Sequence, residues 1–177
     1  MIQELADYEN ASDSNHATHE KLLNTLCFAP DMSSPASGPG YAKTLIVRIP
    51  TSSSSTSSES SVYQTPHGEV VAMAMYFNNY STWHAAPGIY LEDLYVRKPY
   101  RGQGYGTLLL KALAKEVVKI GGKRLEWSCL KWNEPSLKFY RSIGAEEMQE
   151  WVGLRADGDA LMRLAGEAEQ QANVKGV

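Results

Sequence analysis

The sequence has few of the residues that mark disulfide-rich, zinc-binding or membrane-spanning proteins. Only two of its 177 residues are cysteines, Cys27 and Cys129, and they lack Cys-x-x-Cys spacing. Neither a disulfide framework nor a metal site is expected, and a reducing compartment is the default. The chain contains no run of about 18 apolar residues and no basic, apolar leader. It is therefore predicted to be neither secreted nor embedded in a membrane.

A strong net charge is also lacking, but the charges are unevenly distributed. The total is -3, whereas Met1–Tyr90 holds three basic and eight acidic residues and Arg97–Arg141 holds eleven basic and three acidic residues. Two ligand surfaces of opposite charge would produce this difference, and so would solvated helix faces, which composition alone favours. Lys111, Lys115 and Lys119 line one helical face without interleaved aromatic residues, so no nucleic-acid partner is predicted.

The spacing of apolar residues predicts one α/β domain with a mixed sheet. Segments in which apolar and polar residues alternate, or which are rich in β-branched residues, are followed along the chain by amphipathic helices. This order indicates a layered domain. The domain is expected to span residues 1–168, with a flexible serine-rich connection at Thr51–Ser61 and a tail at 169–177. Helices are predicted over residues 2–10, 18–29, 104–120, 133–142 and 158–168, and strands over 43–50, 69–78, 88–96, 123–130 and 148–156.

A glycine-rich loop between a predicted strand and a predicted helix is the strongest local sign of a binding site. Arg97–Gly106 reads RKPYRGQGYG. Its glycines allow a tight turn that brings backbone amides against a bulky anion, and the helix that follows adds its positive dipole end. Arg97, Lys98 and Arg101 add full charges. Because the G-x-G-x-G spacing fits neither the dinucleotide fingerprint nor the nucleotide P-loop, a pyrophosphate site of another kind is predicted, with a plain tight connection as the alternative.

Four segments form a pattern when they are taken together. They are IQELADYEN near the N-terminus, YLEDLYV at 90–96, YRGQGYG at 100–106 and WNEPSLKFYRSIGA at 132–145. In this order they resemble the GNAT superfamily of N-acetyltransferases, and within it the diamine acetyltransferases that act on spermidine, spermine or thialysine. The resemblance implies a central, mixed and mostly antiparallel sheet that is splayed at the acetyl-CoA site and flanked by helices.

The resemblance also implies where acetyl-CoA, the one cofactor expected, would bind. The family holds the thioester along a strand that corresponds to Leu94, Tyr95 and Val96. Asn133 and Ser136, at the start of a later helix, resemble residues that contact the other arm of the cofactor, and Asn133 is equally well explained as a helix cap. The pyrophosphate loop implied by the family pattern R/Q-x-x-G-x-G/A comprises Arg101, Gly102, Gln103, Gly104, Tyr105, Gly106 and Thr107.

Acetyl transfer to an amine needs a base and an acid. An amine of pKa about 10 is neutral in only about one molecule in 10³ at pH 7, so its proton must be removed. By resemblance Glu92 is the general base, acting through water because an ordinary carboxylate is poorly matched to an amine. Tyr140 matches the acid that protonates the leaving thiolate, although in isolation it would be interpreted as a packed aromatic residue.

Acidic residues are implied to receive the cationic amine. Tyr8 and Glu9 match the family's substrate-side pair. Glu92 and Asp93 are adjacent on a strand and would point to opposite faces, unless a β-bulge such as the family has at this strand intervenes. Such a bulge would also leave amides free to polarise the thioester carbonyl.

Two features depart from the family pattern. The chain opens inside the helix that contains Tyr8, so the family's first strand is expected to be missing. Lys131 stands where polyamine acetyltransferases carry Glu. Its positive charge is expected to disfavour spermidine and spermine, and to favour a shorter amine or an amino acid whose carboxylate pairs with Lys131.

The function favoured by these expectations is acetyl-CoA-dependent N-acetylation of a primary amine on a small molecule, such as a diamine, a polyamine or a thialysine-like amino acid. A protein lysine acetyltransferase and a catalytically silent acetyl-CoA-binding module are the alternatives. A homodimer is expected from the resemblance, and a cytoplasmic or also nuclear location from the reducing compartment.

Overall fold

The computed structural model describes most of the chain, and several predictions fall outside the described part. The described residues are 1–26, 40–50 and 64–166. No helix within these ranges is long and apolar enough to cross a membrane. The predictions that lie outside them concern the serine-rich connection Thr51–Ser61, the end of the 18–29 helix and the tail at 169–177.

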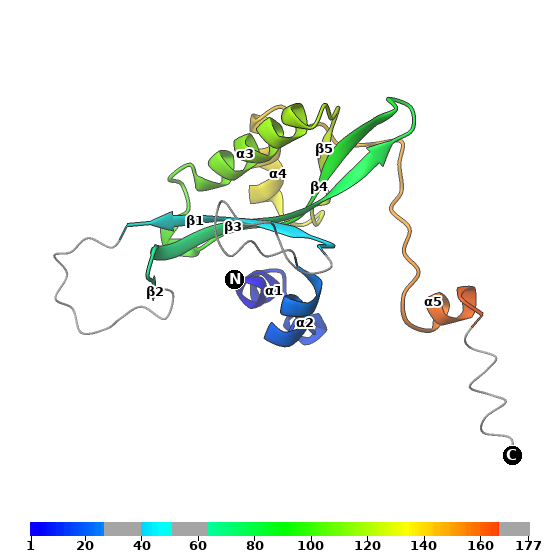
Figure 1. The fold of residues 1–177 in the computed structure, drawn as a ribbon, viewed down its shortest axis with the longest axis horizontal. Coiled ribbons are helices and arrows are strands. Elements are labelled where there is room, and N and C mark those ends of the chain that lie inside the picture. Colours follow the sequence, from blue (N-terminus) through cyan, green and yellow to red (C-terminus); the bar gives the residue numbers. More distant parts are fainter. Residues whose placement is uncertain (27–39, 51–63, 167–177) are drawn as a thin grey trace, which may run out of the picture. The chain divides into compact units, whose positions relative to one another are not determined.

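The first of two compact units, Met1–Ser128, is built on one mixed sheet. Its strand order is β1-β3-β4-β5, with the short β2 also paired to β3, and every pairing is antiparallel except that of β4 with β5. The mixed and mostly antiparallel sheet implied by the resemblance is therefore confirmed (Figure 1). The strands are β1 (Lys43–Ile49), β2 (Gln64–Thr65), β3 (Gly68–Ser81), β4 (Ala86–Val96) and β5 (Leu125–Trp127).

Helices cover both faces of this sheet. Figure 1 shows α1 and α2 on one face and α3 on the other. Residues Val71 to Tyr76 in β3 are all buried, as expected for a strand covered on both sides. On α3 the residues facing the sheet recur at three- and four-residue steps, whereas its lysines are exposed. The helices are α1 (Ile2–Tyr8), α2 (His19–Thr25) and α3 (Tyr105–Lys119), with 3-10 turns η1 (Ser12–Ser14) and η2 (Lys98–Tyr100).

β4 changes its pairing at Glu92. Asp93 lies opposite Met75 of β3, and Leu91 lies opposite the next residue, Tyr76, so Glu92 is an extra residue on β4. This register shift confirms the β-bulge implied by the resemblance. β5 pairs only with Ile89–Leu91 and is shorter than predicted. Among the described residues of this unit, β4 beyond the bulge therefore has a neighbouring strand on one side only.

The second unit begins at Cys129, and its residues up to 166, which the structure describes, form two helices. The predicted helix α4 (Glu134–Ser142) is confirmed, and the Asn133 side chain caps it by accepting a hydrogen bond from the Ser136 amide at 3.4 Å. The helix predicted near the end of the chain is confirmed as α5 (Gly158–Leu164).

The strand predicted over 148–156 is wrong, since none of these residues is in a strand. Its apolar residues Trp151, Val152 and Leu154 are 62%, 81% and 92% exposed. An alternating pattern produces a strand only where an adjacent strand supplies the hydrogen bonds and a covered face buries the side chains. Neither condition can be read from a short stretch of sequence.

Candidate active site

The glycine loop has the backbone conformation that an anion site needs. Gly102 and Gly104 have φ angles of +77° and +84°, and a Cβ built on either would meet no atom within 4 Å. α3 begins at Tyr105, with Gly104 as its N-cap and no side-chain cap. The amides of the first helical turn, which includes Gly106 and Thr107, therefore lack intrahelical acceptors. An open loop and a helix N-terminus together favour an anion, and the contact of these residues with the pyrophosphate of acetyl-CoA stays a prediction.

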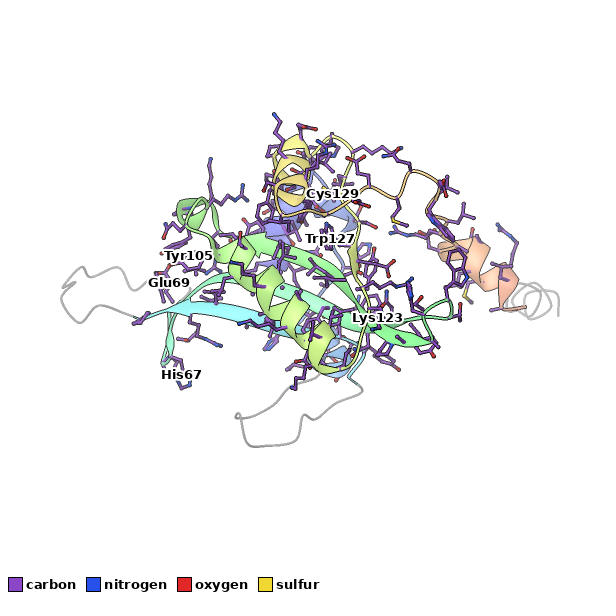
Figure 2. All side chains as sticks on the ribbon, turned by 90° about the horizontal axis from the view of Figure 1, so that it is seen from above. His67, Glu69, Tyr105, Lys123, Trp127 and Cys129 are labelled. Carbon is purple, nitrogen blue, oxygen red and sulfur yellow. The ribbon has the colours of Figure 1, made fainter. Side chains whose placement is uncertain are left out.

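The loop is attached to the sheet through Tyr100. A hydrogen bond between the Tyr100 hydroxyl and the Glu69 carboxylate raises the pKa of Tyr100. Figure 2 shows Glu69, at the start of β3, and Tyr105, at the start of α3, at the same end of the sheet. Gln103 turns back within the loop, where its Nε2 donates to the Pro99 carbonyl at 3.4 Å. The start of the loop is thus attached to the sheet, while Gly102 and Gly104 are exposed and Gly106 is half-buried.

Two of the three basic residues expected to add charge to this loop contact other residues of the protein. Arg97 is only 7% exposed and pairs with Glu4 of α1. The Nε of Arg101 donates to the Val96 carbonyl at 3.0 Å, and its guanidinium lies 4.7 Å from the centre of the Tyr8 ring. Arg101 is exposed nonetheless, so its charge is still accessible to an anion, as is that of Lys98.

The strand residues implied to hold the thioester lie just beyond the bulge. Leu94, Tyr95 and Val96 pair with β3 along one edge, and no described strand of the first unit pairs with their other edge. Within this unit the backbone groups of that second edge can serve a ligand that hydrogen-bonds as an added strand would.

Three carboxylates interact around the bulge. Glu92 is exposed and Asp93 is half-buried. Burial, together with the negative charges of Glu92 and Glu9, raises the pKa of Asp93 to about 6. Burial also raises the pKa of Glu9, which follows the last residue of α1. Because Glu92 and Glu9 each repel a charge on Asp93, a cation placed beside Asp93 would favour its ionised form.

The remaining predicted residues belong to the second unit. Asn133 is buried and Ser136 half-buried at the start of α4, so the capping role of Asn133 is confirmed and its contact with the cofactor stays a prediction. Tyr140 is half-buried, with its ring 5.4 Å from that of Phe139. Lys131 is exposed. The residues that the structure brings together are therefore those of the first unit, namely Tyr8, Glu9, Glu92, Asp93, Leu94, Tyr95, Val96 and the glycine loop.

One pair near the site was not anticipated from the sequence, the ion pair of Glu4 with Arg97. It joins residues 93 positions apart. The spacing of Glu4 and Tyr8 places both on one face of α1, but it does not indicate that Arg97 is the partner of Glu4. Among the described residues, no three His, Cys, Asp or Glu side chains are grouped in a way that could hold a metal ion.

Comparison with known families decides the class of the protein. Residues 47–145 match the Acetyltransferase (GNAT) family, which is more than half of the chain. The chain belongs to the GNAT family. The resemblance inferred from the sequence is therefore confirmed. The GNAT family consists of acyltransferases, and its co-substrate is acetyl-CoA.

Two relatives and one solved structure are similar to this chain over different lengths. The L-ornithine N5-acetyltransferase NATA1 of Arabidopsis thaliana is 42% identical over 95 residues, which are 54% of this chain and 42% of that protein. Thialysine N-epsilon-acetyltransferase of Bos taurus is 32% identical over 175 residues. The matched region spans 94% of this chain and 88% of the Bos taurus protein. An integron cassette protein of V. cholerae has a similar structure, with a TM-score of 0.65 and 26% sequence identity. The match spans 92% of this chain and 85% of the V. cholerae chain. The chain spans less than half the length of the Arabidopsis relative.

Proposed function

We propose that this GNAT protein transfers the acetyl group of acetyl-CoA to a primary amine of a small molecule, namely a diamine or an amino acid with a terminal amine such as thialysine or ornithine. The observation that carries the proposal is the acidic group of Glu9, Glu92 and Asp93. It lies beside the part of β4 that, in the first unit, has a neighbouring strand on one side only. This group would receive a cation where the family places the thioester. The relatives that act on thialysine and ornithine support the same chemical class.

The acidic group would first act on the ammonium form of the substrate. Its negative charges attract the cation and hold its nitrogen near the bulge. Glu92 then takes a proton through water, leaving a neutral nitrogen. The pKa of Asp93, raised by burial and by its two acidic neighbours to about 6, lies nearer to neutrality than that of an ordinary carboxyl. Asp93 is therefore the second proton acceptor to test, since a base works best when its pKa is close to the working pH.

The acyl transfer itself forms one bond and breaks another. The neutral nitrogen attacks the thioester carbonyl carbon, and the carbonyl oxygen gains negative charge that backbone amides at the bulge would stabilise. The carbon–sulfur bond then breaks, and the thiolate takes a proton, which by the resemblance comes from the Tyr140 hydroxyl. The nitrogen, positively charged after the attack, loses its second proton as the amide forms, and this proton replaces the one given to sulfur. The products are an N-acetylated amine and free coenzyme A thiol, and the first proton, taken by Glu92, leaves to solvent.

Thiol release over a panel of amines tests this proposal. The panel contains ornithine, thialysine, short diamines, spermidine and a lysine-containing peptide, each with acetyl-CoA. Replacing the base or the acid, in Glu92→Gln and Tyr140→Phe, should lower kcat by about 10²–10⁴-fold while acetyl-CoA still raises the Tm. Thiol release with the peptide alone would identify a protein lysine acetyltransferase. Thermal protection by acetyl-CoA without thiol release from any amine would identify a silent binding module.

The assembly and location of the protein stay predictions. The homodimer follows from the resemblance and the cytoplasmic or nuclear location from the scarcity of cysteine. Size-exclusion chromatography with light scattering would test the first.

A further inference from the structure

The pair of Glu4 and Arg97 joins the first helix to the end of the strand that carries the candidate site. Arg97 directly follows β4, and its Nε and Nη2 atoms lie 3.0–3.2 Å from the Glu4 carboxylate oxygens. The side chain of Arg97 is 8% exposed and that of Glu4 is 28% exposed. Burial alone would raise the pKa of Glu4, but the hydrogen bonds and positive charge of Arg97 contribute to holding this pKa below its usual value. The pair is thus an ionised and largely enclosed contact.

Arg97 is itself held firmly by β3. The register of β3 against β1 shifts next to Val47, which leaves Val71 as an extra residue on β3. The Val71 carbonyl accepts a hydrogen bond from the Arg97 backbone amide at 3.0 Å, and the Val70 carbonyl accepts one from Arg97 Nη1. The guanidinium is therefore tied to the sheet from one side and offered to Glu4 from the other.

α1 depends on such contacts for its position. It has seven residues, and none of them is fully buried. A helix this short is not stable in isolation, so tertiary contacts must set its place. Glu4 and Tyr8 are one turn apart on the same face, and Tyr8 lies against Arg101, whose guanidinium is also 5.6 Å from the Tyr95 ring. Two cations from the end of β4 and the following loop thus fasten the helix that brings Glu9 toward Asp93.

We propose that Glu4 and Arg97 are positioning residues for the amine substrate. The pair holds α1 so that Tyr8 and Glu9 face the bulge of β4, and it takes no part in proton transfer or acyl transfer. Loss of the pair should weaken binding of the amine and leave binding of acetyl-CoA and the chemical step nearly unchanged. The inference deepens the proposed function and rests on it for the identity of the ligand as an amine.

The test compares two neutralised carboxylates on the same helix. Glu4→Gln removes the negative charge that faces Arg97. Asp7→Asn removes an exposed negative charge, whose carboxylate accepts hydrogen bonds from the Ser12 and Gln3 side chains. Glu4→Gln should raise the KM for the best amine about tenfold, because the helix that carries Tyr8 and Glu9 loses a charged hydrogen bond to the sheet. The KM for acetyl-CoA and kcat at saturating amine should stay within twofold. Asp7→Asn should leave all three values within twofold, which controls for the general loss of negative charge.

Hydrogen exchange of the free protein supplies a measurement that does not depend on activity. Amides in the last turn of α1 should exchange about tenfold faster in Glu4→Gln than in the wild type, while those of β3 and β4 keep their protection. Arg97→Lys keeps the charge but loses the paired geometry of the guanidinium, so it should give an intermediate rise in KM and in α1 exchange. This variant serves as the check if a larger change at Arg97 prevents folding.

Two results would overturn the positioning role. Unchanged amine KM and unchanged α1 exchange in Glu4→Gln would mean that the pair does not place the helix. Equal losses in both KM values and in kcat, with faster exchange throughout the sheet, would mean that the pair only stabilises the fold. Failure of the proposed function looks different, since the wild type would then release no thiol with any amine, and the exchange of α1 would still decide the role of the pair.

Discussion

The two halves of β4 belong to one strand but have different surroundings. From Ala86 to Leu91 the strand runs beside β3 and, at its end, also beside β5, and its Ile89 is fully buried. From Asp93 to Val96 it pairs with β3 alone among the described strands of this unit, and Glu92 and Asp93 are two of the three carboxylates of the candidate site. One extra residue at Glu92 separates the halves. The comparison teaches that a single strand can contribute to the core with one half, while its other half holds a partly buried carboxyl whose ionisation costs stability, as is common at functional sites.

The largest expected effect is on the buried half. Ile89→Ala should lower the free energy of unfolding by about 2–5 kcal/mol, because it leaves a cavity in a region where the Ile89 side chain is 0% exposed. Urea unfolding measures this loss, and the amine KM of the folded protein should stay within about twofold. Ile46→Ala on β1, where the side chain is 43% exposed, is the control and should cost less than about 1 kcal/mol. Similar losses at both positions would mean that the buried half of β4 has no special part in stability.

The next effect has the opposite sign and lies beyond the bulge. Because burial and the charges of Glu92 and Glu9 raise the pKa of Asp93 to about 6, its ionisation is harder in the folded protein than in the unfolded chain. The stability that this group adds is complete below about pH 4 and is lost as the pH rises through about 6. Asp93→Asn removes this loss, so it should stabilise the protein by about 1–2 kcal/mol at pH 8, less than the full shift implies because the group is partly solvated.

Activity should fall in the same variant. Asp93→Asn removes one charge that receives the amine, so kcat/KM should drop about 10²-fold. Unfolding at pH 5 and pH 8, with kcat/KM at pH 8, gives both results from one preparation. Asp7→Asn is the contrasting control, because hydrogen bonds from Ser12 and Gln3 lower the pKa of Asp7, and its loss should not stabilise the protein at high pH. A variant at Asp93 that is both less stable and less active at pH 8 would contradict the division of β4 into a stabilising and a binding half.

The same division shows what sequence could and could not predict. The helix of α3 and the strands β1, β3 and β4 follow from periodic apolar residues, whose pattern is local. The bulge at Glu92 came only from the family resemblance, since nothing in YLEDLYV by itself says that one residue is unpaired. The contact of Glu4 with Arg97 and the raised pKa of Asp93 depend on how distant segments pack, so no local pattern predicts them. The false strand at 148–156 has the same cause, because pairing depends on a partner that the segment does not encode.

The smallest expected effect concerns the lower limb of the pH profile. The negative charge of Glu9 is one cause of the raised pKa of Asp93, after burial and the charge of Glu92. Glu9→Gln should therefore lower the pKa of Asp93 and move the acidic limb of kcat/KM against pH toward lower pH. Glu92→Gln should move this limb further, because the charge of Glu92 has a larger influence on Asp93 than that of Glu9, if enough activity is left to measure it.

The variants are compared by the midpoint of the acidic limb of kcat/KM against pH. The absolute rate is unsuitable, because Glu9 is also expected to contact the amine and its loss would raise KM at every pH. Glu20→Gln, on the exposed first turn of α2, removes one charge of the same kind and should leave the midpoint unchanged. A midpoint that stays in place in Glu9→Gln would mean that Asp93 does not govern the limb. The half of β4 beyond the bulge would then receive the amine through Glu92 alone, and the raised pKa of Asp93 would be a cost of burial without a role in binding.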